Sequence, residues 1–212
     1  MKNKLVFSAL LLLPFFSNAQ HLKPKSMATF GLINSFLNQR WNFGYMHQLN
    51  ERIWIGTDLG FGSKGTVLPP VEDVLSYKSY EVRPAVYYSL RPESKLKHFL
   101  GAEFFHISTE RREDFFHFWD NEQYYWADAA TINRTKTGGN LTYSILLHGD
   151  KSRIAFMPKI GVGLRNLQIK YADAVGLSQS IPPKDGFPLL SMEPREGTRF
   201  NLDFDIKLVV KF

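Results

Sequence analysis

The sequence predicts an all-β fold, an eight-stranded antiparallel up-and-down transmembrane β-barrel. Three observations lead to this prediction: apolar and polar residues alternate in several stretches, tight and long connections follow one another in order, and an apolar leader begins the chain. Each barrel strand faces lipid with every second residue and the lumen with the others, so alternation is the expected pattern. The mean hydropathy of −0.23 does not oppose a barrel, because the two rows cancel in any averaging window.

The last predicted strand carries the clearest alternation. Every even position from Phe200 to Phe212 is apolar, whereas nearly all odd positions from Arg199 to Lys211 are charged or polar. This stretch is longer than the usual strand of about 5 to 6 residues in a globular sheet. A tilted membrane-spanning strand needs about 9 to 11 residues, which the stretch supplies with a short extension.

Seven further stretches with the same two-residue period complete the predicted barrel. They cover residues 27–37, 41–49, 53–62, 80–90, 99–107, 140–147 and 153–165. Short connections at 50–51, 91–95 and 149–152 alternate with long ones at 63–78, 109–130 and 172–197. Only the first hairpin, near Asn38 and Gln39, is short on the side of the long loops. Short periplasmic turns and long extracellular loops are typical of outer-membrane barrels.

The N-terminus has the form of a secretory signal peptide. Lys2 and Lys4 precede an uncharged apolar run over residues 5–16, and small residues follow at 17–19. The run is too short for a membrane-spanning helix, which needs roughly 20 apolar residues. We therefore predict a signal peptide over residues 1–19, cleavage after Ala19, and one barrel domain over residues 20–212. The absence of cysteine excludes a lipid-anchored cysteine and disulfide bonds.

Charge and motifs exclude several classes of function. The net charge of +6 is dispersed without a basic block, so nucleic acid is not an expected partner. The chain has no phosphate loop, cysteine cluster or nucleotide fingerprint, and its six histidines lack metal-ligand spacing, so no cofactor or metal is expected.

The alternating strands and the terminal aromatic residue together resemble small OmpA-like or OmpX-like outer-membrane barrels. Gln20 after a small-residue cleavage site is similar to envelope proteins of the Bacteroidota. The resemblance implies a place in the outer membrane, among lipid and lipopolysaccharide. It also implies an insertion signal read by the barrel-insertion machinery, formed by Ile206, Leu208, Val210 and Phe212.

A periplasmic lipocalin-like barrel is an alternative, in which the apolar row would face an internal ligand cavity. Against it, several glycines fall on the polar face, where a small barrel needs interior space: Gly56, Gly60, Gly62, Gly101, Gly161 and Gly163. Aromatic residues in the apolar rows stand mostly near strand ends, as interfacial girdles do.

The polar face of a membrane barrel becomes its lumen, and eight strands leave only enough space for side chains. Charges there must pair, so we predict a salt-bridged plug rather than a gated ion path. The predicted network consists of Asp58, Glu81, Arg83, Glu103, Lys159, Arg165, Asp203, Asp205 and Lys207.

An enzymatic alternative rests on His106 and Ser108, which stand two apart on one strand face, as a base and a nucleophile would. The pair faintly resembles the His-x-Ser of outer-membrane lipid A deacylases. Glu103 falls on the opposite face and cannot complete a triad, and the residues after Ser108 depart from that family's pattern.

The long loops are the other expected functional region, since loops on a rigid scaffold carry recognition. The loop at 109–130 combines arginines and aromatic residues that suit an unidentified surface ligand or a fold over the barrel mouth. These binding candidates are Arg111, Arg112, Phe115, Phe116, Phe118, Trp119, Tyr124, Tyr125 and Trp126. The sequence therefore favours a non-enzymatic outer-membrane barrel that serves envelope integrity or surface binding.

Overall fold

The computed structural model describes residues 25–67, 74–94, 96–120, 123–148, 152–179 and 196–212. The predicted signal peptide and its cleavage site at Ala19 lie outside the described residues, so they stay predictions.

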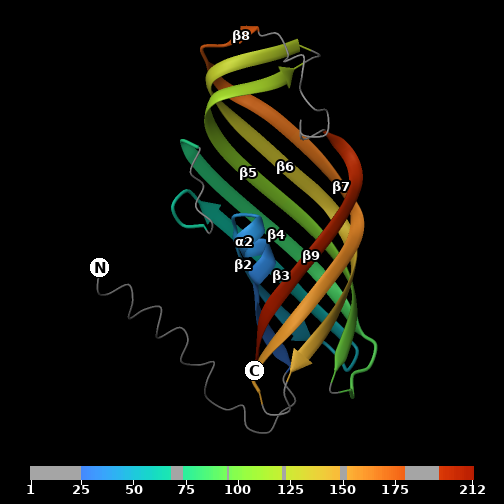
Figure 1. Cartoon of the computed structure of the whole chain (residues 1–212). Helices are drawn as coiled ribbons and strands as arrows, with labels where there is room; N and C mark the ends of the chain where they lie inside the picture. Colours follow the sequence, from blue (N-terminus) through green and yellow to red (C-terminus); the bar gives the residue numbers. More distant parts are fainter. Residues whose placement is uncertain (1–24, 68–73, 95, 121–122, 149–151, 180–195) are drawn as a thin grey trace, which may run out of the picture.

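Eight strands close into a ring in which every neighbouring pair is antiparallel (Figure 1). They are β1 Ser26–Gly31, β2 Trp41–Gln48, β3 Ile53–Ser63, β4 Ser76–Ser89, β5 Lys97–Asp120, β6 Gln123–His148, β7 Ile154–Val175 and β9 Gly197–Lys211. The two-residue strand β8 (Ser178–Gln179) adds to β6 outside the ring order. The predicted eight-stranded antiparallel β-barrel is confirmed.

The ring is closed by β1 and β9. Their register pairs Met27 with Lys211 and Gly31 with Lys207. One residue beyond this ladder, the backbones of Ser26 and Phe212 exchange two hydrogen bonds of 3.1 and 3.0 Å. The barrel therefore has no open edge between β1 and β9, and an open edge is what invites pairing with other chains.

The strand predicted over residues 27–37 is wrong in its second half, which forms the helix α2 (Leu32–Leu37). The backbone N–H groups of Ile33 and Asn34 donate to Asp205 Oδ1 at 3.1 and 3.2 Å, which satisfies donors that a helix start leaves free. Asn34 and Ser35 are both buried, although neighbours in a strand would face opposite ways. The helix contacts β9 and β2, where β1 has ended (Figure 1).

The loop predicted over residues 109–130 is also wrong, because β5 and β6 continue through it as one hairpin. Their ladder extends to the pairing of Asp120 with Gln123, so only residues 121 and 122 separate the strands. β7 likewise continues past Arg165 to Val175. Aromatic and β-branched residues favour strands, and this segment is rich in aromatic residues.

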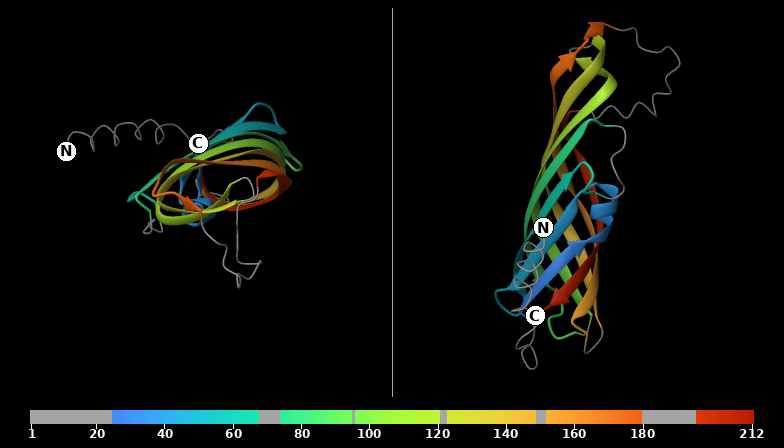
Figure 2. Two further views of the ribbon diagram at one scale, coloured as in Figure 1. Left: turned by 90° about the horizontal axis from the view of Figure 1, so that it is seen from above. Right: turned by 90° about the vertical axis from the view of Figure 1, so that its left-hand side faces the viewer.

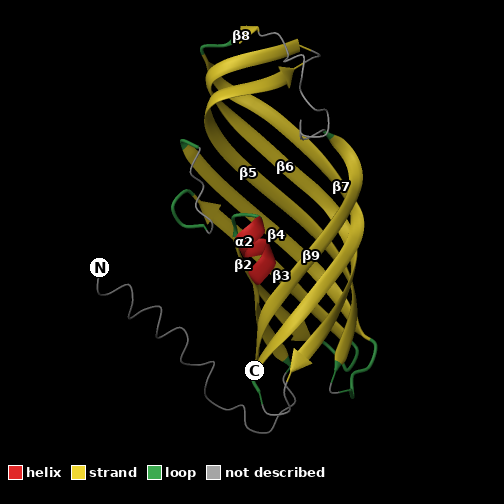
Figure 3. Cartoon of the chain, in the orientation of Figure 1, coloured by secondary structure: helices red, strands yellow, loops and turns green. Residues whose placement is uncertain are grey.

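The unequal strand lengths make the barrel taller on one side. β5, β6 and β7 have 24, 26 and 22 residues, whereas β1, β2 and β3 have 6, 8 and 11. Figure 2 shows β5, β6 and β7 rising well above the rest, and Figure 3 shows that this projection is almost entirely strand. We call it the tall wall. The C-terminus and the short turns lie at the opposite end, here called the lower end (Figure 1).

Candidate functional site in the barrel lumen

The outer surface of the barrel carries the apolar row of each strand. Leu202, Leu141 and Phe200 are 71%, 69% and 62% exposed, although they lie within long strands. The other row points into the barrel, where Lys159 and Lys207 are only 1% and 2% exposed. A lipocalin-like barrel requires the reverse arrangement, so that alternative is wrong.

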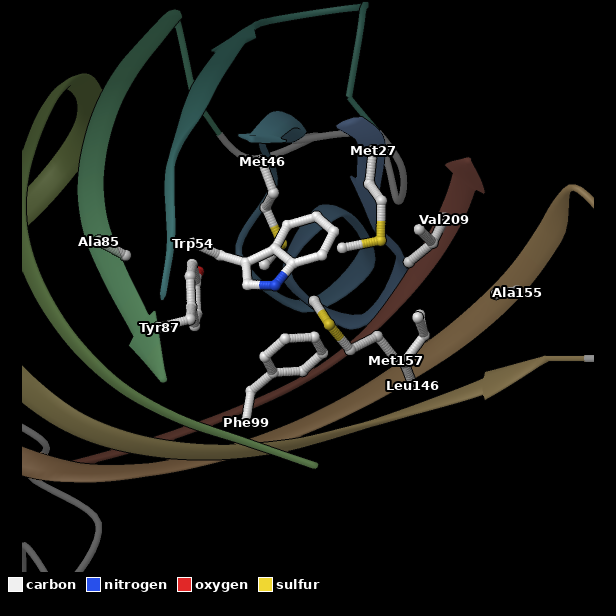
Figure 4. Packing of buried hydrophobic residues seen from close by; sticks show 10 residues of the cluster. All are labelled: Met27, Met46, Trp54, Ala85, Tyr87, Phe99, Leu146, Ala155, Met157 and Val209. Carbon is white, nitrogen blue, oxygen red and sulfur yellow. The ribbon is translucent and has the colours of Figure 1, made fainter. Parts of the chain in front are cut away.

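The lower end of the lumen is filled by apolar side chains. Trp54 lies at the centre of this group, with Phe99 edge-on to it at a ring-centroid distance of 5.9 Å (Figure 4). We call it the apolar seal, and its members are Met27, Met46, Trp54, Ala85, Tyr87, Phe99, Leu146, Ala155, Met157 and Val209. The seal was not predicted, although the inward row of most strands becomes apolar toward the short turns. That signal was present at Trp54, Tyr87 and Val209.

Above the apolar seal, Arg83 is the centre of a group of buried ion pairs. Its guanidinium lies 2.7 Å from Glu81 Oε1, 2.6 Å from Glu103 Oε1 and 3.1 Å from Asp203 Oδ2. It also lies 5.2 Å from the ring centroid of Phe105, within the range of a cation–π contact. Strands β4, β5 and β9 thus bring their charges to one guanidinium.

Lys159 of β7 joins two of the same carboxylates. Its Nζ lies 2.9 Å from Glu103 Oε2 and 2.7 Å from Asp203 Oδ2. Lys207 Nζ lies 2.5 Å from Asp58 Oδ2, on the side of β3. Every one of these carboxylates therefore has a cation within ion-pair distance, as buried charges require.

Arg40 was not predicted but belongs to this group. It comes just before β2, and its Nε donates to Glu81 Oε2 at 3.0 Å. Its position two residues before the inward Asn42 was the available signal. We call the whole group the paired cluster: Arg40, Asp58, Glu81, Arg83, Glu103, Lys159, Asp203 and Lys207. With four acids and four bases, the paired cluster has no net formal charge.

The two other predicted network residues form no ion pair with the paired cluster among the described residues. Asp205 is buried and accepts the N–H groups at the start of α2, so backbone donors stabilise its carboxylate. Arg165 of β7 lies higher in the lumen, and its buried Nε has no hydrogen-bond partner among the described residues. Arg165 repels two cations of β6, Lys136 and Arg134.

These three cations belong to a second group in the upper lumen. Arg134 and Lys136 of β6 and Arg111 of β5 line a cavity of about 360 Å³, and Arg165 lies beside them. Arg111 forms an ion pair with Glu113, which also lines the cavity. We call Arg111, Arg134, Lys136 and Arg165 the upper cation cluster. Four cations against the one carboxylate of Glu113 leave a net formal charge of +3.

Glycines provide the space that the paired cluster occupies. A Cβ atom at Gly44 would collide with the carboxylate of Asp58 and the hydroxyl of Thr29. At Gly60 it would collide with the side chains of Asn42 and Glu81. The absence of a side chain at these positions allows the charged groups to approach the barrel wall.

The catalytic candidates lie on the outside of the barrel. His106 and Ser108 are both exposed on the outward row of β5, and His106 Nδ1 lies 2.9 Å from Thr137 Oγ1 in a hydrogen bond. Glu103 points into the lumen, as predicted from its parity, and its carboxylate is held by Arg83 and Lys159.

The loop-binding candidates are distributed along the tall wall. Arg111 lines the upper cavity, whereas its neighbour Arg112 is paired in register with Ser76 of β4. Tyr125 packs against buried Ala127 and Ala130 of β6. Trp126 is half-buried on the same strand. The side chains of the other candidates lie outside the described residues: Phe115, Phe116, Phe118, Trp119 and Tyr124.

The residues of the predicted insertion signal share the outward row of β9. Val210 is 40% exposed, and Ile206, Leu208 and Phe212 are half-buried. The ring of Phe212 lies 6.3 Å from that of Tyr45 on β2, across the short strand β1.

Within the described ranges, no group of three or more histidine or acidic residues could hold a metal ion. The described part of the chain also contains no helix of the length and apolarity needed to cross a membrane.

No protein-family model matches the sequence, and no curated protein matches it significantly. Solved structures similar in fold include CarO and CarO2 of Acinetobacter baumannii, with TM-scores of 0.44 and 0.42 and sequence identities of 12% and 8%. Each alignment covers 92% of this chain and 100% of the other.

Proposed function

We propose that this chain is a non-enzymatic outer-membrane β-barrel of a Gram-negative envelope, with a lumen closed to diffusion. This proposal rests on one observation: apolar residues cover the outside of the barrel and charged residues fill its middle, the reverse of a water-soluble protein. A closed barrel satisfies its backbone hydrogen bonds internally, so it can stand in lipid without an exposed edge. The lower end, with the C-terminus and short turns, then faces the periplasm.

The closed lumen is supported by two successive layers. The apolar seal occupies the periplasmic end, and Trp54, Phe99 and Met157 within it are at most 2% exposed. The paired cluster follows above it and leaves its ions bound to one another. An ion crossing the barrel would have to separate those pairs and then enter an apolar layer, and both steps are unfavourable.

Surface recognition is assigned to the tall wall. The exposed apolar residues on the outside of the strands form a band that we call the apolar belt, and the tall wall projects beyond it. In β5 the outward row changes from Leu100 and Phe104 to His106, Ser108 and Glu110. A three-stranded projection of this kind would present side chains to lipopolysaccharide or to a ligand outside the cell. The insertion machinery would recognise the outward row of β9, and lipid and lipopolysaccharide would surround the apolar belt.

Membrane residence is tested by fractionation and by gel migration. The protein is expected in the outer-membrane fraction, and an unheated detergent sample is expected to migrate differently from a boiled one. Recovery in the soluble periplasmic fraction with identical migration would refute the proposal.

The closed lumen has its own test, conductance in a planar lipid bilayer. The wild-type barrel is expected to give no steady conductance above that of the protein-free bilayer. Well-defined conductance steps from a heat-modifiable preparation would contradict the closed lumen while leaving the membrane assignment intact.

The enzymatic alternative is tested by lipid A mass. Because His106 donates or accepts a hydrogen bond with Thr137, and Glu103 is committed to buried ion pairs, we expect unchanged lipid A when the gene is deleted. A change in acyl-chain number that His106→Ala reproduces would support the deacylase.

A further inference from the structure

The upper cavity has the properties of a small-molecule binding site. Its volume of about 360 Å³ falls within the range of ligand pockets, roughly 300 to 1,000 Å³. Strands β4, β5 and β6, together with Arg40 and the residues after α2, contribute to its wall. A site built from elements of both sides of the barrel is held in place by the closed sheet.

The charges of this cavity are unbalanced in a way that the paired cluster is not. Arg165 and Arg134 both repel Lys136, and Arg111 and Arg165 repel Arg134. Among the described residues, Glu113 is the one carboxylate that lines the cavity, and Arg111 already pairs with it. Glu81, which attracts Lys136, is paired with Arg40 and Arg83. Among the described residues these cations repel one another, and a bound anion would offset that repulsion.

Arg165 provides an independent observation. Its Nε atom is buried without a hydrogen-bond partner among the described residues, although a buried donor is normally satisfied. A guanidinium presents its donors in a planar fork that fits two oxygens of one anionic group. A bound oxyanion could accept a hydrogen bond from this donor and offset the positive charge of the cavity.

We infer that the upper cavity binds a phosphate-bearing group, held by Arg134 and Lys136 of its wall, with Arg165 next to these two residues. A phosphate carries close to two negative charges at neutral pH and three acceptor oxygens, which suits a cluster of net formal charge +3. Tyr77, Ile107 and Ile132 on the cavity wall offer apolar surface to the rest of the molecule. Free sugar phosphates and the headgroup of lipopolysaccharide share this chemistry.

The site faces the outside of the cell if the proposed function holds, but its binding chemistry does not depend on the membrane. The experiment uses the purified full-length barrel in detergent micelles. Isothermal titration is performed with glucose 6-phosphate and, in a parallel arm, with lipopolysaccharide. Glucose and dephosphorylated lipopolysaccharide are the counterparts that lack phosphate.

The wild-type protein is expected to bind at least one phosphorylated probe with a Kd below about 1 mM, and its counterpart at least tenfold more weakly. Replacing Arg134→Gln or Arg165→Gln should weaken binding roughly tenfold each. The matched control is Lys170→Gln, which removes an outward-facing, exposed cation from β7 and should leave the affinity unchanged.

Each result distinguishes the source or overturns the site. Binding of glucose 6-phosphate identifies a free phosphate, whereas binding of lipopolysaccharide alone identifies the headgroup. Equal affinity of wild type and the double variant R134Q/R165Q would overturn the site, as would the absence of binding to both phosphorylated probes. Heat-modifiable migration of every variant verifies folding, and it remains informative about the proposed function if no probe binds.

Discussion

The paired cluster and the upper cation cluster occupy the same lumen, but the charges are balanced in the first and unbalanced in the second. In the paired cluster four acids match four bases, and ion-pair distances run from 2.5 to 3.1 Å. In the upper cation cluster there is one carboxylate for four cations, it pairs with Arg111, and three of the cations line a cavity. Within the paired cluster, where side chains exclude water, each charge has an opposite charge beside it, whereas the charges around the cavity are not balanced. A charged side chain that is buried away from water needs a partner, because an unpaired buried charge is energetically costly.

This difference gives charge removal opposite consequences in the two clusters. Loss of a cation from the paired cluster leaves carboxylates buried without a counterion. Loss of a cation from the upper cation cluster relieves repulsion. The sign of the change in unfolding free energy therefore distinguishes the two regions, and four experiments test the distinction.

The largest effect is expected from Lys159→Met. It leaves Glu103 and Asp203 with Arg83 as their shared cation, and breaking a buried ion pair costs about 3 to 5 kcal/mol. Guanidinium unfolding of the barrel in lipid vesicles measures the loss. The control is Lys78→Met, because Lys78 and Glu110 form an exposed pair at 3.9 Å whose loss should cost under about 1 kcal/mol. Equal losses in the two variants would contradict the buried pairing.

A smaller loss is expected from Gly44→Ala, which tests how tightly the paired cluster is packed. The new methyl group must displace the carboxylate of Asp58 from Lys207, and overpacking of this kind costs about 1 to 3 kcal/mol. Gly139→Ala on β6 is the control, since Gly139 is exposed and a Cβ there meets only the carbonyl of Glu103 at 3.3 Å. The same unfolding titration serves both. A neutral Gly44→Ala would show that the cluster has room to rearrange.

A gain in stability is expected from Arg134→Gln. Removing this charge relieves its repulsion with Arg111 and Arg165, and an unfolding free energy higher by roughly 0.5 kcal/mol is expected in low salt. The measurement is made without phosphate in the buffer. A loss of more than about 1 kcal/mol would place Arg134 in a structural role instead, and the comparison between the clusters would fail.

The smallest effect concerns salt. Sodium chloride screens exposed charges more than buried ones, so raising it should stabilise the wild-type barrel by a few tenths of a kcal/mol through the upper cation cluster. The double variant R134Q/R165Q should show less of this gain. Lys159→Met should retain it in full, because the upper cation cluster is intact in that variant. Identical salt responses in all three proteins would refute the charge imbalance.

The strand order and the inward residues were predictable because the alternation has a period of two wherever one face is apolar and the other polar. The inward orientation of Glu103 and Lys159 could be predicted directly from this period. Their partners did not follow, since the sequence does not fix the register between strands far apart in the chain. Arg40 was not predicted as part of the network, because it lies just outside the alternating stretch of β2.

Two errors have a common physical origin. At Leu32–Leu37 the apolar pattern was read as a strand, although helix and strand periods are hard to separate over six residues. At residues 109–130 charged and aromatic residues interrupt the alternation, yet the backbones of β5 and β6 keep pairing. Beyond an apolar belt the outward row has no reason to be apolar, so the pattern fades while the ladder continues.

The pairing of Ser26 with Phe212 sets the order in which this barrel can assemble. These two residues stand at opposite ends of the described chain, and the β1–β9 ladder joins segments separated by all the other strands. Hairpins such as β5–β6 can form locally, but this last contact requires the largest loop closure in the molecule. Contacts between residues far apart in the sequence slow folding. We therefore expect the joining of β1 to β9 to be the slow, final step of barrel assembly.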